Sequence, residues 1–325
     1  MSDLLLAADV GATKTNLALY AVADGVLTAV DEAHLVNEGY GGLEDVVRTF
    51  LRDRTDVPSA ACFGIAGPVA EGRSRMPNLG WLIDAAGLAR TLRLARVVLL
   101  NDLEANAHGI ATLSPEQLMV LNPGAAVARG NAALIAAGTG LGEATLYWDG
   151  TRHHVCASEG GHADFGPRNA EEIGILGRLM DRFGHVSWER VVSGPGLHNI
   201  YDALDVPEVP EVAARIASAA DASATITELA QTGGSARAAR ALDVFVSAYG
   251  AEAGNLALKT LATGGIYVGG GIAPKLLSRI ADGTFMRGFT DKGRFSEWLG
   301  RIPVRIILDQ KTALRGAAAY LAATR

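Results

Sequence analysis

Residues 4–23, LLLAADVGATKTNLALYAVA, decide the fold. The nearly continuous apolar run from Leu4 to Val10 is typical of a strand that is covered on both faces. It ends in Asp9-Val10-Gly11-Ala12-Thr13, where a glycine between small side chains favours a tight turn. A second strand, Thr15 to Ala23, follows at once. The chain therefore opens on two strands that are joined by a glycine- and threonine-containing turn.

The next segments extend this opening into an α/β pattern. The Asp24-Gly25 pair predicts a hairpin into a third strand, Val26 to Val36. Helical spacing and short apolar runs then alternate, which predicts the order βββ followed by αβαβ. The predicted elements are a helix within 42–54, a strand at 59–65, a helix that Asp84 caps and that ends by Leu94, and a strand at 97–100.

The opening pattern returns in residues 133–150, ALIAAGTGLGEATLYWDG. An apolar strand, the turn Gly138-Thr139-Gly140-Leu141-Gly142, a strand from Glu143 to Trp148 and an Asp149-Gly150 turn follow in the same order as before. Two copies indicate a duplicated architecture, in which two phosphate-gripping turns would lie on opposite walls of one cleft. Any two hairpins share this much, so the pattern alone leaves the duplication open.

The remaining chain is predicted to be mostly helical before it returns to strands. Helices dominate from Ala170 to Ala262, and a buried strand from Gly264 to Gly271 ends in a glycine cluster. A strand from Val304 to Leu308 and a last helix from Ala313 to Ala323 close the chain.

Composition limits the partners and the compartment. A chain of 325 residues is long enough for about two domains. The net charge is −6 and the 29 Lys and Arg residues are scattered, so neither nucleic acid nor a membrane surface is an expected partner. No apolar stretch reaches the roughly 18 residues of a membrane span, and the N-terminus lacks the features of a signal peptide. Cys62 and Cys156 suit neither a disulfide scaffold nor a zinc site, so we expect a cytoplasmic protein.

The first candidate site is the turn from Asp9 to Thr13. Gly11 would let the backbone approach an anion, Thr13 supplies a hydroxyl, and Asp9 can orient Mg²⁺ through water. Because the chain carries no global positive charge, a polyanion would have to be held largely by backbone N–H groups. Ordinary turn chemistry is the alternative explanation for Asp-x-Gly at a hairpin.

Two further glycine clusters offer the same chemistry. Gly138-Thr139-Gly140 presents backbone donors where the outer phosphates of ATP would lie, and a tight glycine hairpin is its alternative explanation. Gly269-Gly270-Gly271, before a helix opened by Pro274, is a suitable floor for adenine or ribose. A close helix–strand packing corner is the alternative explanation for Gly269-Gly270-Gly271.

Asn101 and Asp102 lie where a buried strand gives way to an Ala-rich helix, and ligand sites of open α/β sheets collect at such strand ends. Asp102 is a candidate base that accepts the proton of an attacking hydroxyl, and Asn101 would hold a neighbouring hydroxyl. A simple helix cap is an equally good explanation of Asp102.

Glu159-Gly160-Gly161-His162 is a candidate polyol site. The carboxylate can accept from two hydroxyls, the imidazole can pair with a third, and the glycines would leave room for a sugar ring. A metal site is disfavoured, because no further Cys or His lies at ligand spacing nearby. The other histidines, among them His34, His108 and His198, are expected to be surface or packing residues.

Taken together, these segments resemble the bacterial glucokinase family, the group outside the repressor/ORF/kinase (ROK) class, within the hexokinase and actin-like ATPase superfamily. The similar segments follow the family order from about residue 7 to about residue 320. They are Ala8-Asp9-Val10-Gly11-Ala12-Thr13, Asn78-Leu79-Gly80-Trp81, Asn101-Asp102-Leu103-Glu104-Ala105, Gly138-Thr139-Gly140-Leu141-Gly142, Ser158-Glu159-Gly160-Gly161-His162, Ser193-Gly194-Pro195-Gly196-Leu197, Gly269-Gly270-Gly271-Ile272 and Asp291-Lys292-Gly293-Arg294-Phe295.

The resemblance implies a two-domain actin-like ATPase (ribonuclease H-like) α/β fold, with a duplicated βββαβαβα core and a ligand cleft between the domains. The implied domains are a small α/β domain, 1–112 plus 303–325, and a larger α+β domain, 113–302. It also implies a homodimer that uses ATP with Mg²⁺ and glucose. The matching positions are Asp102 as catalytic base, Asn101, Asp102, Glu159, His162 and Glu189 around the sugar, and Ala8, Asp9, Val10, Gly11, Ala12, Thr13, Gly138, Thr139, Gly140, Gly269, Gly270 and Gly271 around the nucleotide.

Two alternatives to a glucokinase stay open. The family usually has a second glycine where this chain has Ala12, whose methyl group is tolerable if its φ is negative. The altered turn motivates a non-catalytic sugar sensor, although no helix-turn-helix precedes the first strand. A kinase for another hexose or an amino sugar is the second alternative, because sequence does not fix which ring hydroxyls are contacted.

Overall fold

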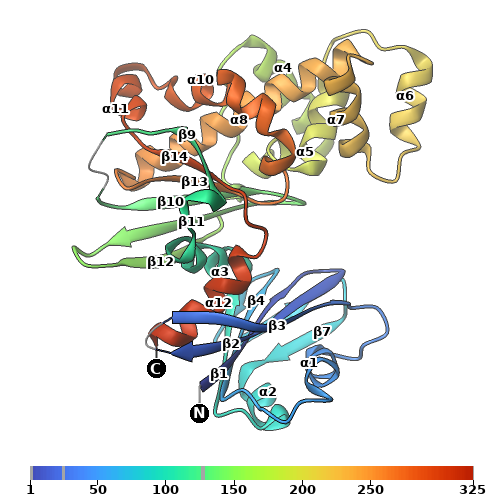
Figure 1. Ribbon diagram of the computed structural model, residues 1–325. Helices are drawn as coiled ribbons and strands as arrows, with labels where there is room; N and C mark the ends of the chain where they lie inside the picture. Colours follow the sequence, from blue (N-terminus) through green and yellow to red (C-terminus); the bar gives the residue numbers. More distant parts are fainter. Residues whose placement is uncertain (1–2, 24–25, 126–128, 325) are drawn as a thin grey trace. The chain divides into compact units, whose positions relative to one another are not determined.

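The computed structural model describes residues 3–23, 26–125 and 129–324. The predicted Asp24-Gly25 turn and the first two residues, on which the signal-peptide argument partly depends, lie outside this set. The chain forms two compact units, which are described separately (Figure 1). Unit 1 comprises Met1–Gln117 and Asp309–Arg325, and unit 2 comprises Leu118–Leu308.

Unit 1 is built on a five-stranded sheet of order β3-β2-β1-β4-β8. β1 pairs antiparallel with β2 and parallel with β4, and β4 pairs parallel with β8. The strands are β1 (Asp3–Val10), β2 (Lys14–Ala23), β3 (Val26–Val36), β4 (Ala60–Ile65) and β8 (Arg96–Asn101).

Both faces of β1 are covered, as its apolar sequence predicts. Successive side chains of a strand point to opposite faces. Leu6 and Ala8 pack with α1 (Leu43–Leu51) and α2 (Ala85–Leu92), whereas Leu5 and Ala7 pack with α12 (Thr312–Ala323). Asp84 caps α2 by accepting a hydrogen bond from Gly87 N at 2.9 Å, which confirms the predicted helix start.

A three-stranded sheet in unit 1 was not expected from the sequence. β5 (Val69–Ala70), β6 (Arg73–Met76) and β7 (Trp81–Asp84) form an antiparallel meander. Met76 and Trp81 join the core beneath α1 and α2. Strands this short carry too few alternating residues to give a period-2 signal.

Unit 2 repeats the topology of unit 1, which confirms the predicted duplication. Its six-stranded sheet has the order β12-β11-β10-β13-β14-β9. Counted in chain order from β10, the first five positions run 3-2-1-4-5, as in unit 1, and β9 is added at the far edge. The strands are β9 (Leu118–Asn122), β10 (Ala132–Ala137), β11 (Leu141–Trp148), β12 (His153–Ser158), β13 (Gly265–Gly269) and β14 (Val304–Ile307).

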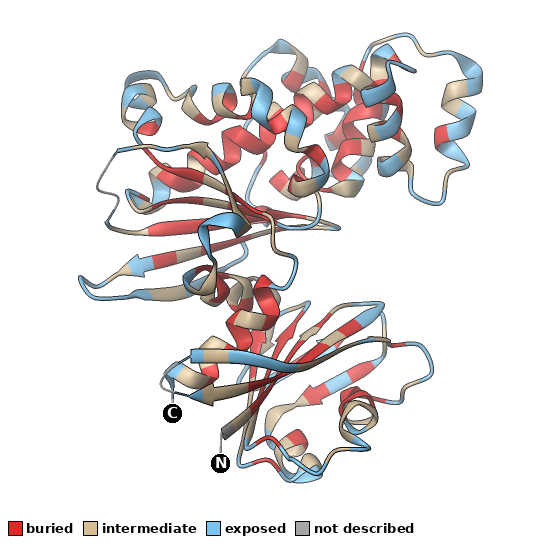
Figure 2. Ribbon diagram, viewed as in Figure 1, coloured by how far each residue is buried: buried red, intermediate tan, exposed pale blue. Residues whose placement is uncertain are grey.

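In unit 2, α5, α7 and α10 pack against the long helix α8 (Ala236–Thr260), whose residues are largely buried (Figure 2). The chain is mostly helical between β12 and β13, as predicted. Ala273–Leu276, which contains Pro274, is only a short 3-10 turn, and the helical stretch after it kinks at Gly283, where φ is +93°. The other helices are α4 (Ala170–Phe183), α5 (Gly194–Ala203), α6 (Pro210–Ala217), α7 (Ala222–Thr232), α9 (Leu277–Arg279), α10 (Phe285–Thr290) and α11 (Ser296–Gly300). Among the helices of the described ranges, none is long and apolar enough to span a membrane.

Candidate functional site

In unit 1 the parallel strands bring two predicted sites to one edge of the sheet. The register pairs Val10 with Ile65, and Ile65 with Asn101. β1, β4 and β8 therefore end level with one another. The turn after β1 and the start of α3 (Asp102–Gly109) both leave the sheet at its carboxyl edge, where α/β folds collect ligands.

The turn after β1 is held by Asn37, which sequence reasoning missed. Gly11 N donates to Lys14 O at 3.0 Å, and Asn37 Nδ2 donates to Gly11 O at 2.8 Å. Asn37 N donates to Thr13 O at 2.9 Å. Ala12 is not among the residues with positive φ, so its methyl group does not strain the turn. The condition that the sequence set for Ala12 is met.

Asp9 lies at the start of a polar chain on the same edge. Asn16 Nδ2 donates to Asp9 Oδ2 at 3.2 Å, and His34 Nδ1 lies 2.6 Å from Asn16 Oδ1. Burial raises the pKa of Asp9, against the hydrogen bond from Asn16 and the charge of Lys14. His34, expected to be a surface or packing residue, thus also makes a polar contact that leads to Asp9.

Asn101 has taken the capping role that the sequence left open for Asp102. Asn101 Oδ1 accepts from Leu103 N at 2.9 Å, and its Nδ2 donates to Gly67 O at 3.1 Å. Asp102 Oδ1 lies 3.0 Å from the same Leu103 N, at the first turn of α3, where the helix dipole favours negative charge. Both polar ends of Asn101 are thus engaged within unit 1.

Close packing fixes the start of α3 against the sheet. An added Cβ at Gly64 of β4 would lie 2.9 Å from Ala105 Cβ and 3.8 Å from Asp102 Cα. An added Cβ at Gly316 of α12 would overlap Ala105 O. Two glycines on different elements therefore let α3 approach closely, which positions Asp102 at the edge of the sheet.

In unit 2, three predicted sugar residues lie close together. His162 Nε2 is 3.8 Å from Glu159 Oε2, and His162 Nδ1 is 4.0 Å from Glu189 Oε1. The side chains of Glu159 and His162 are 72% and 59% exposed, so a ligand can reach them. Glu189 Oε2 also accepts from Leu141 N at 3.0 Å. The carboxylate of Glu189 therefore links His162 to the Gly138–Gly142 turn.

The two glycines of the sugar turn, as we call residues 158–162, make room for β11. An added Cβ at Gly161 would overlap Leu141 O, and one at Gly160 would overlap the carboxyl group of Glu143. The sequence predicts that these glycines leave room for a sugar ring. Their missing side chains also let the turn pack directly on the neighbouring strand.

A pocket of about 880 Å³ lies in unit 2 beside the glycine turns. Gly138 and Thr139 line it from the turn after β10, and Gly271 lines it from the turn after β13. Its volume lies within the usual range of small-molecule sites. The rest of the wall is mixed: it has apolar and hydroxyl groups, such as Pro195 and Ser223, and the charged side chains of Asp221, Glu228 and Lys275.

Tyr249 of α8 links the strand ends that precede both glycine turns. Its side chain is fully buried, and its hydroxyl accepts from Ala137 N at 3.1 Å. Carbonyl oxygens of Gly269 and Ile135 lie 3.2 and 3.4 Å from the same hydroxyl. Gly270, at φ +82°, packs so closely on Ala137 O that an added Cβ would overlap it. Sequence reasoning missed Tyr249, because nothing in a long helix marks one tyrosine as a partner of a distant strand end.

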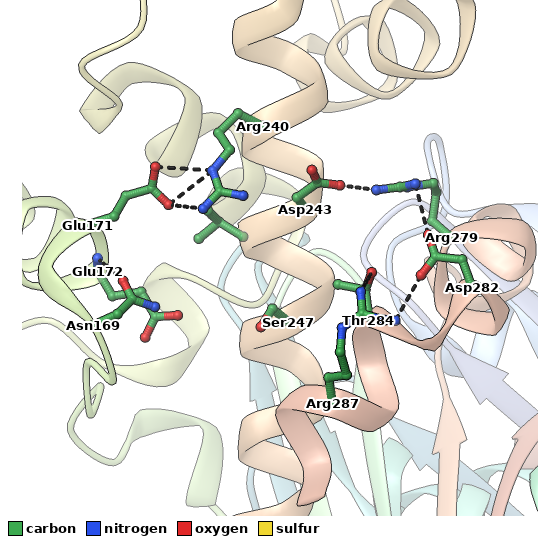
Figure 3. A pocket seen from close by; sticks show the side chains of 11 residues that line it. Asn169, Glu171, Glu172, Arg240, Asp243, Ser247, Arg279, Asp282, Thr284 and Arg287 are labelled. Carbon is green, nitrogen blue, oxygen red and sulfur yellow. Dashed lines mark hydrogen bonds and ion pairs between the residues drawn. The ribbon is translucent and has the colours of Figure 1, made fainter. Parts of the chain in front are cut away.

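A second pocket, of about 430 Å³, is lined mainly by ion pairs (Figure 3). Arg240 contacts Glu171, and Arg279 contacts Asp243 and Asp282. These charges neutralise one another within the wall of the pocket. The pocket is therefore a polar junction between helices and a poor competitor for a polyanionic nucleotide.

The fold and the clustered residues define a class, the sugar kinases built on the actin-like ATPase fold. Within that class the particular family is shown by a family model described as Glucokinase, which matches residues 6–324. The chain belongs to the glucokinase family, which confirms the resemblance drawn from its motifs.

Individual relatives agree with the family match. The chain is 40% identical to a glucokinase of Nostoc sp. (strain PCC 7120), over 97% of this chain and 98% of the relative. A crystal structure of glucokinase from an Antarctic psychrotroph is similar at TM-score 0.87 and 31% identity, and the match covers all of both chains. A ROK family glucokinase from Streptomyces griseus shares the fold at TM-score 0.65 and 22% identity, over 99% of this chain and 100% of that one.

Proposed function

We propose that the protein transfers the γ-phosphate of ATP to the 6-hydroxyl of glucose, giving glucose 6-phosphate and ADP, with Asp102 as general base. The observation that carries the proposal is the position of Glu189. Its carboxylate faces His162 on one side and binds the Leu141 N–H of a glycine turn on the other. Glu189 thus connects side chains that suit a polyol with a glycine turn that suits phosphate.

The acceptor side of the proposal uses the exposed cluster of unit 2 and the strand-end edge of unit 1. Glu159, His162 and Glu189 would bind ring hydroxyls, because carboxylates accept from hydroxyls and imidazole can donate or accept. Asn101 is assigned to the sugar with Asp102, although its amide already bonds Gly67 O and Leu103 N. In this proposal Asn101 both caps the start of α3 and contacts the sugar.

Asp102 would accept the proton of the attacking hydroxyl as the new O–P bond forms and the bond to the ADP oxygen breaks. The transition state of phosphoryl transfer is loose, so the position of the base matters more than its strength. The level strand ends and the close packing of α3 support this assignment, because they fix where the carboxylate sits in unit 1.

The nucleotide is assigned to the three glycine turns. Residues 8–13, Gly138–Gly140 and Gly269–Gly271 offer backbone donors at strand ends, and the last two border the pocket of about 880 Å³. The Streptomyces griseus relative is described in complex with glucose and AMPPNP, which supports an adenine nucleotide and glucose as the ligands.

Mg²⁺ belongs to this proposal as the partner of ATP, where it would neutralise charge on the phosphates. Within the described ranges no group of three or more His, Cys, Asp or Glu side chains could hold a metal ion. Mg²⁺ usually keeps several waters and takes only one or two carboxylates beside the phosphates. Asp9 is the carboxylate that we assign, and Asn16 orients it.

Two further parts of the proposal extend to assembly and location. We assign a homodimer on the resemblance that the motifs carry. We assign the cytoplasm as the compartment because the proposed reaction consumes ATP.

The test is a coupled assay of ADP release with ATP, Mg²⁺ and a panel of sugars, with the product identified by ³¹P NMR. Glucose should give the highest kcat/KM and glucose 6-phosphate as the product. The matched control is 6-deoxyglucose, which keeps the ring but lacks the acceptor and should bind without turnover. Sugar binding without ADP release would favour the sensor, and a higher kcat/KM for another sugar would reassign the substrate.

A further inference from the structure

Two buried carboxyl groups lie beneath the sugar turn, and the proposed reaction uses neither. Glu143 of β11 and Glu252 of α8 are 2% and 0% exposed. The register pairs Glu143 with Ser158, the first residue of the sugar turn. Because an added Cβ at Gly160 would overlap Glu143 Oε2, the backbone of the turn packs directly on this carboxyl group.

The surroundings of the two groups are unequal. Glu252 Oε2 accepts from Asn255 Nδ2 at 2.7 Å, and Glu252 Oε1 accepts from Lys259 Nζ at 3.2 Å. Among the described residues, Oε1 of Glu143 is buried without a hydrogen-bond partner. An ionised Glu143 would therefore be a buried carboxylate facing another carboxylate, whereas a protonated Glu143 can donate to Glu252.

Charges from the neighbouring elements complete this picture. Burial, and then the charge of Glu252, raises the pKa of Glu143, against the charge of Lys259. Lys292, from the Asp291–Phe295 motif, packs its stem on α8, where an added Cβ at Gly254 would lie 3.1 Å from Lys292 Cε. The other groups around the pair are Tyr249, Asn255 and Lys259 of α8 and Lys292 after α10. Arg168, Glu172 and Asp291 act in turn on Lys292 through their charges.

We propose that Glu143 is a positioning residue, held neutral against Glu252, which fixes the sugar turn and makes glucose binding weaken as pH rises. This inference rests on the proposed function, because it takes the sugar turn as part of the glucose site. Loss of the proton to solvent leaves two carboxylates face to face under Gly160. Their repulsion and the entry of water shift the turn, and with it Glu159 and His162.

The first test measures the Kd of glucose without ATP, from about pH 7 to about pH 9.5. Above the pKa of Glu143 the neutral fraction falls about tenfold per pH unit, so the Kd should rise by the same factor. Glu143→Gln keeps a neutral donor and should give a nearly flat profile. Glu297→Gln makes the same substitution at a side chain that is 82% exposed, and it should keep the wild-type slope. Equal slopes in the wild type and Glu143→Gln overturn the proposal.

The second test follows the turn itself and is independent of glucose. Cys156 of β12 is exposed and Cys62 is buried, so a ¹⁹F thiol label can be placed two residues before the sugar turn. Its resonance should titrate in the alkaline range in the wild type and not in Glu143→Gln. If Glu143→Gln does not fold, the wild-type titration decides, and a resonance that stays constant refutes the proposal. Absence of glucose phosphorylation would contradict the proposed function instead, and the label would still report on the turn.

Discussion

Tyr249→Phe tests whether one buried hydroxyl fixes the two glycine turns of unit 2. The substitution removes a single oxygen atom from a side chain that is fully buried. Ala137 N then loses the acceptor at 3.1 Å, and Gly269 O loses its neighbour at 3.2 Å. A buried donor that is left unsatisfied costs about 1–3 kcal/mol, so we expect the free energy of unfolding to fall by about that amount.

Thermal unfolding followed by circular dichroism measures this loss. For a unit of this size, about 1 kcal/mol corresponds to a Tm shift of about 2–4 °C. The matched control is Tyr147→Phe in β11, because that side chain is 57% exposed and its loss should stay within about 0.5 kcal/mol. Since the hydroxyl holds the strand ends before both turns, KM for ATP should also rise in Tyr249→Phe, while KM for glucose changes less. Equal Tm values and equal KM values in the two variants would refute the reasoning.

Three further substitutions test other parts of the account. Gly316→Ala should destabilise the protein by about 1–3 kcal/mol in urea unfolding and lower kcat, because the new methyl group would overlap Ala105 O. The control is Gly177→Ala in α4, where the methyl group meets open space, and it should be neutral or stabilising. Gly270→Ala should weaken ATP binding by calorimetry about 5- to 100-fold, since it combines a φ of +82° with an overlap at Ala137 O; unchanged affinity would contradict the packing. The free energy of unfolding of Glu143→Gln should rise relative to that of the wild type as pH rises. The pKa of Glu143 is raised in the folded state, so the wild type loses stability between the ordinary pKa of 4.5 and the raised value. A constant difference between the two proteins from about pH 5 to about pH 9 would show that Glu143 does not titrate there.

The sequence predicts most of the strands and helices and their order along the chain, because the evidence for them is local. The apolar runs at 4–10 and 133–137 each predict a strand from their own residues, without information from distant parts of the chain. The repeats predict the duplication, whereas the spatial strand order 3-2-1-4-5 comes from the structure. The meander β5–β7 escapes prediction, because its strands are too short for a periodic signal.

The candidate site is predictable where glycine clusters and adjacent polar residues mark it. Glu159 and His162 lie in one short segment, and Glu189 joins them in the structure. The supporting groups are not predictable in this way, since Tyr249 acts on a residue more than a hundred positions away. The contacts of Gly160 and Gly161 to β11 were not predictable either, because they depend on strand pairing.

The most direct test of the account is the turnover of Asp102→Asn. The amide oxygen can still accept from Leu103 N, as Asp102 Oδ1 does at 3.0 Å, so the start of α3 should keep its shape. We expect kcat to fall by about 10² to 10⁴, because a general base contributes a factor of this size, while the Kd of glucose stays within about threefold. A variant that phosphorylates glucose at close to the wild-type kcat would contradict the role of Asp102 as the base.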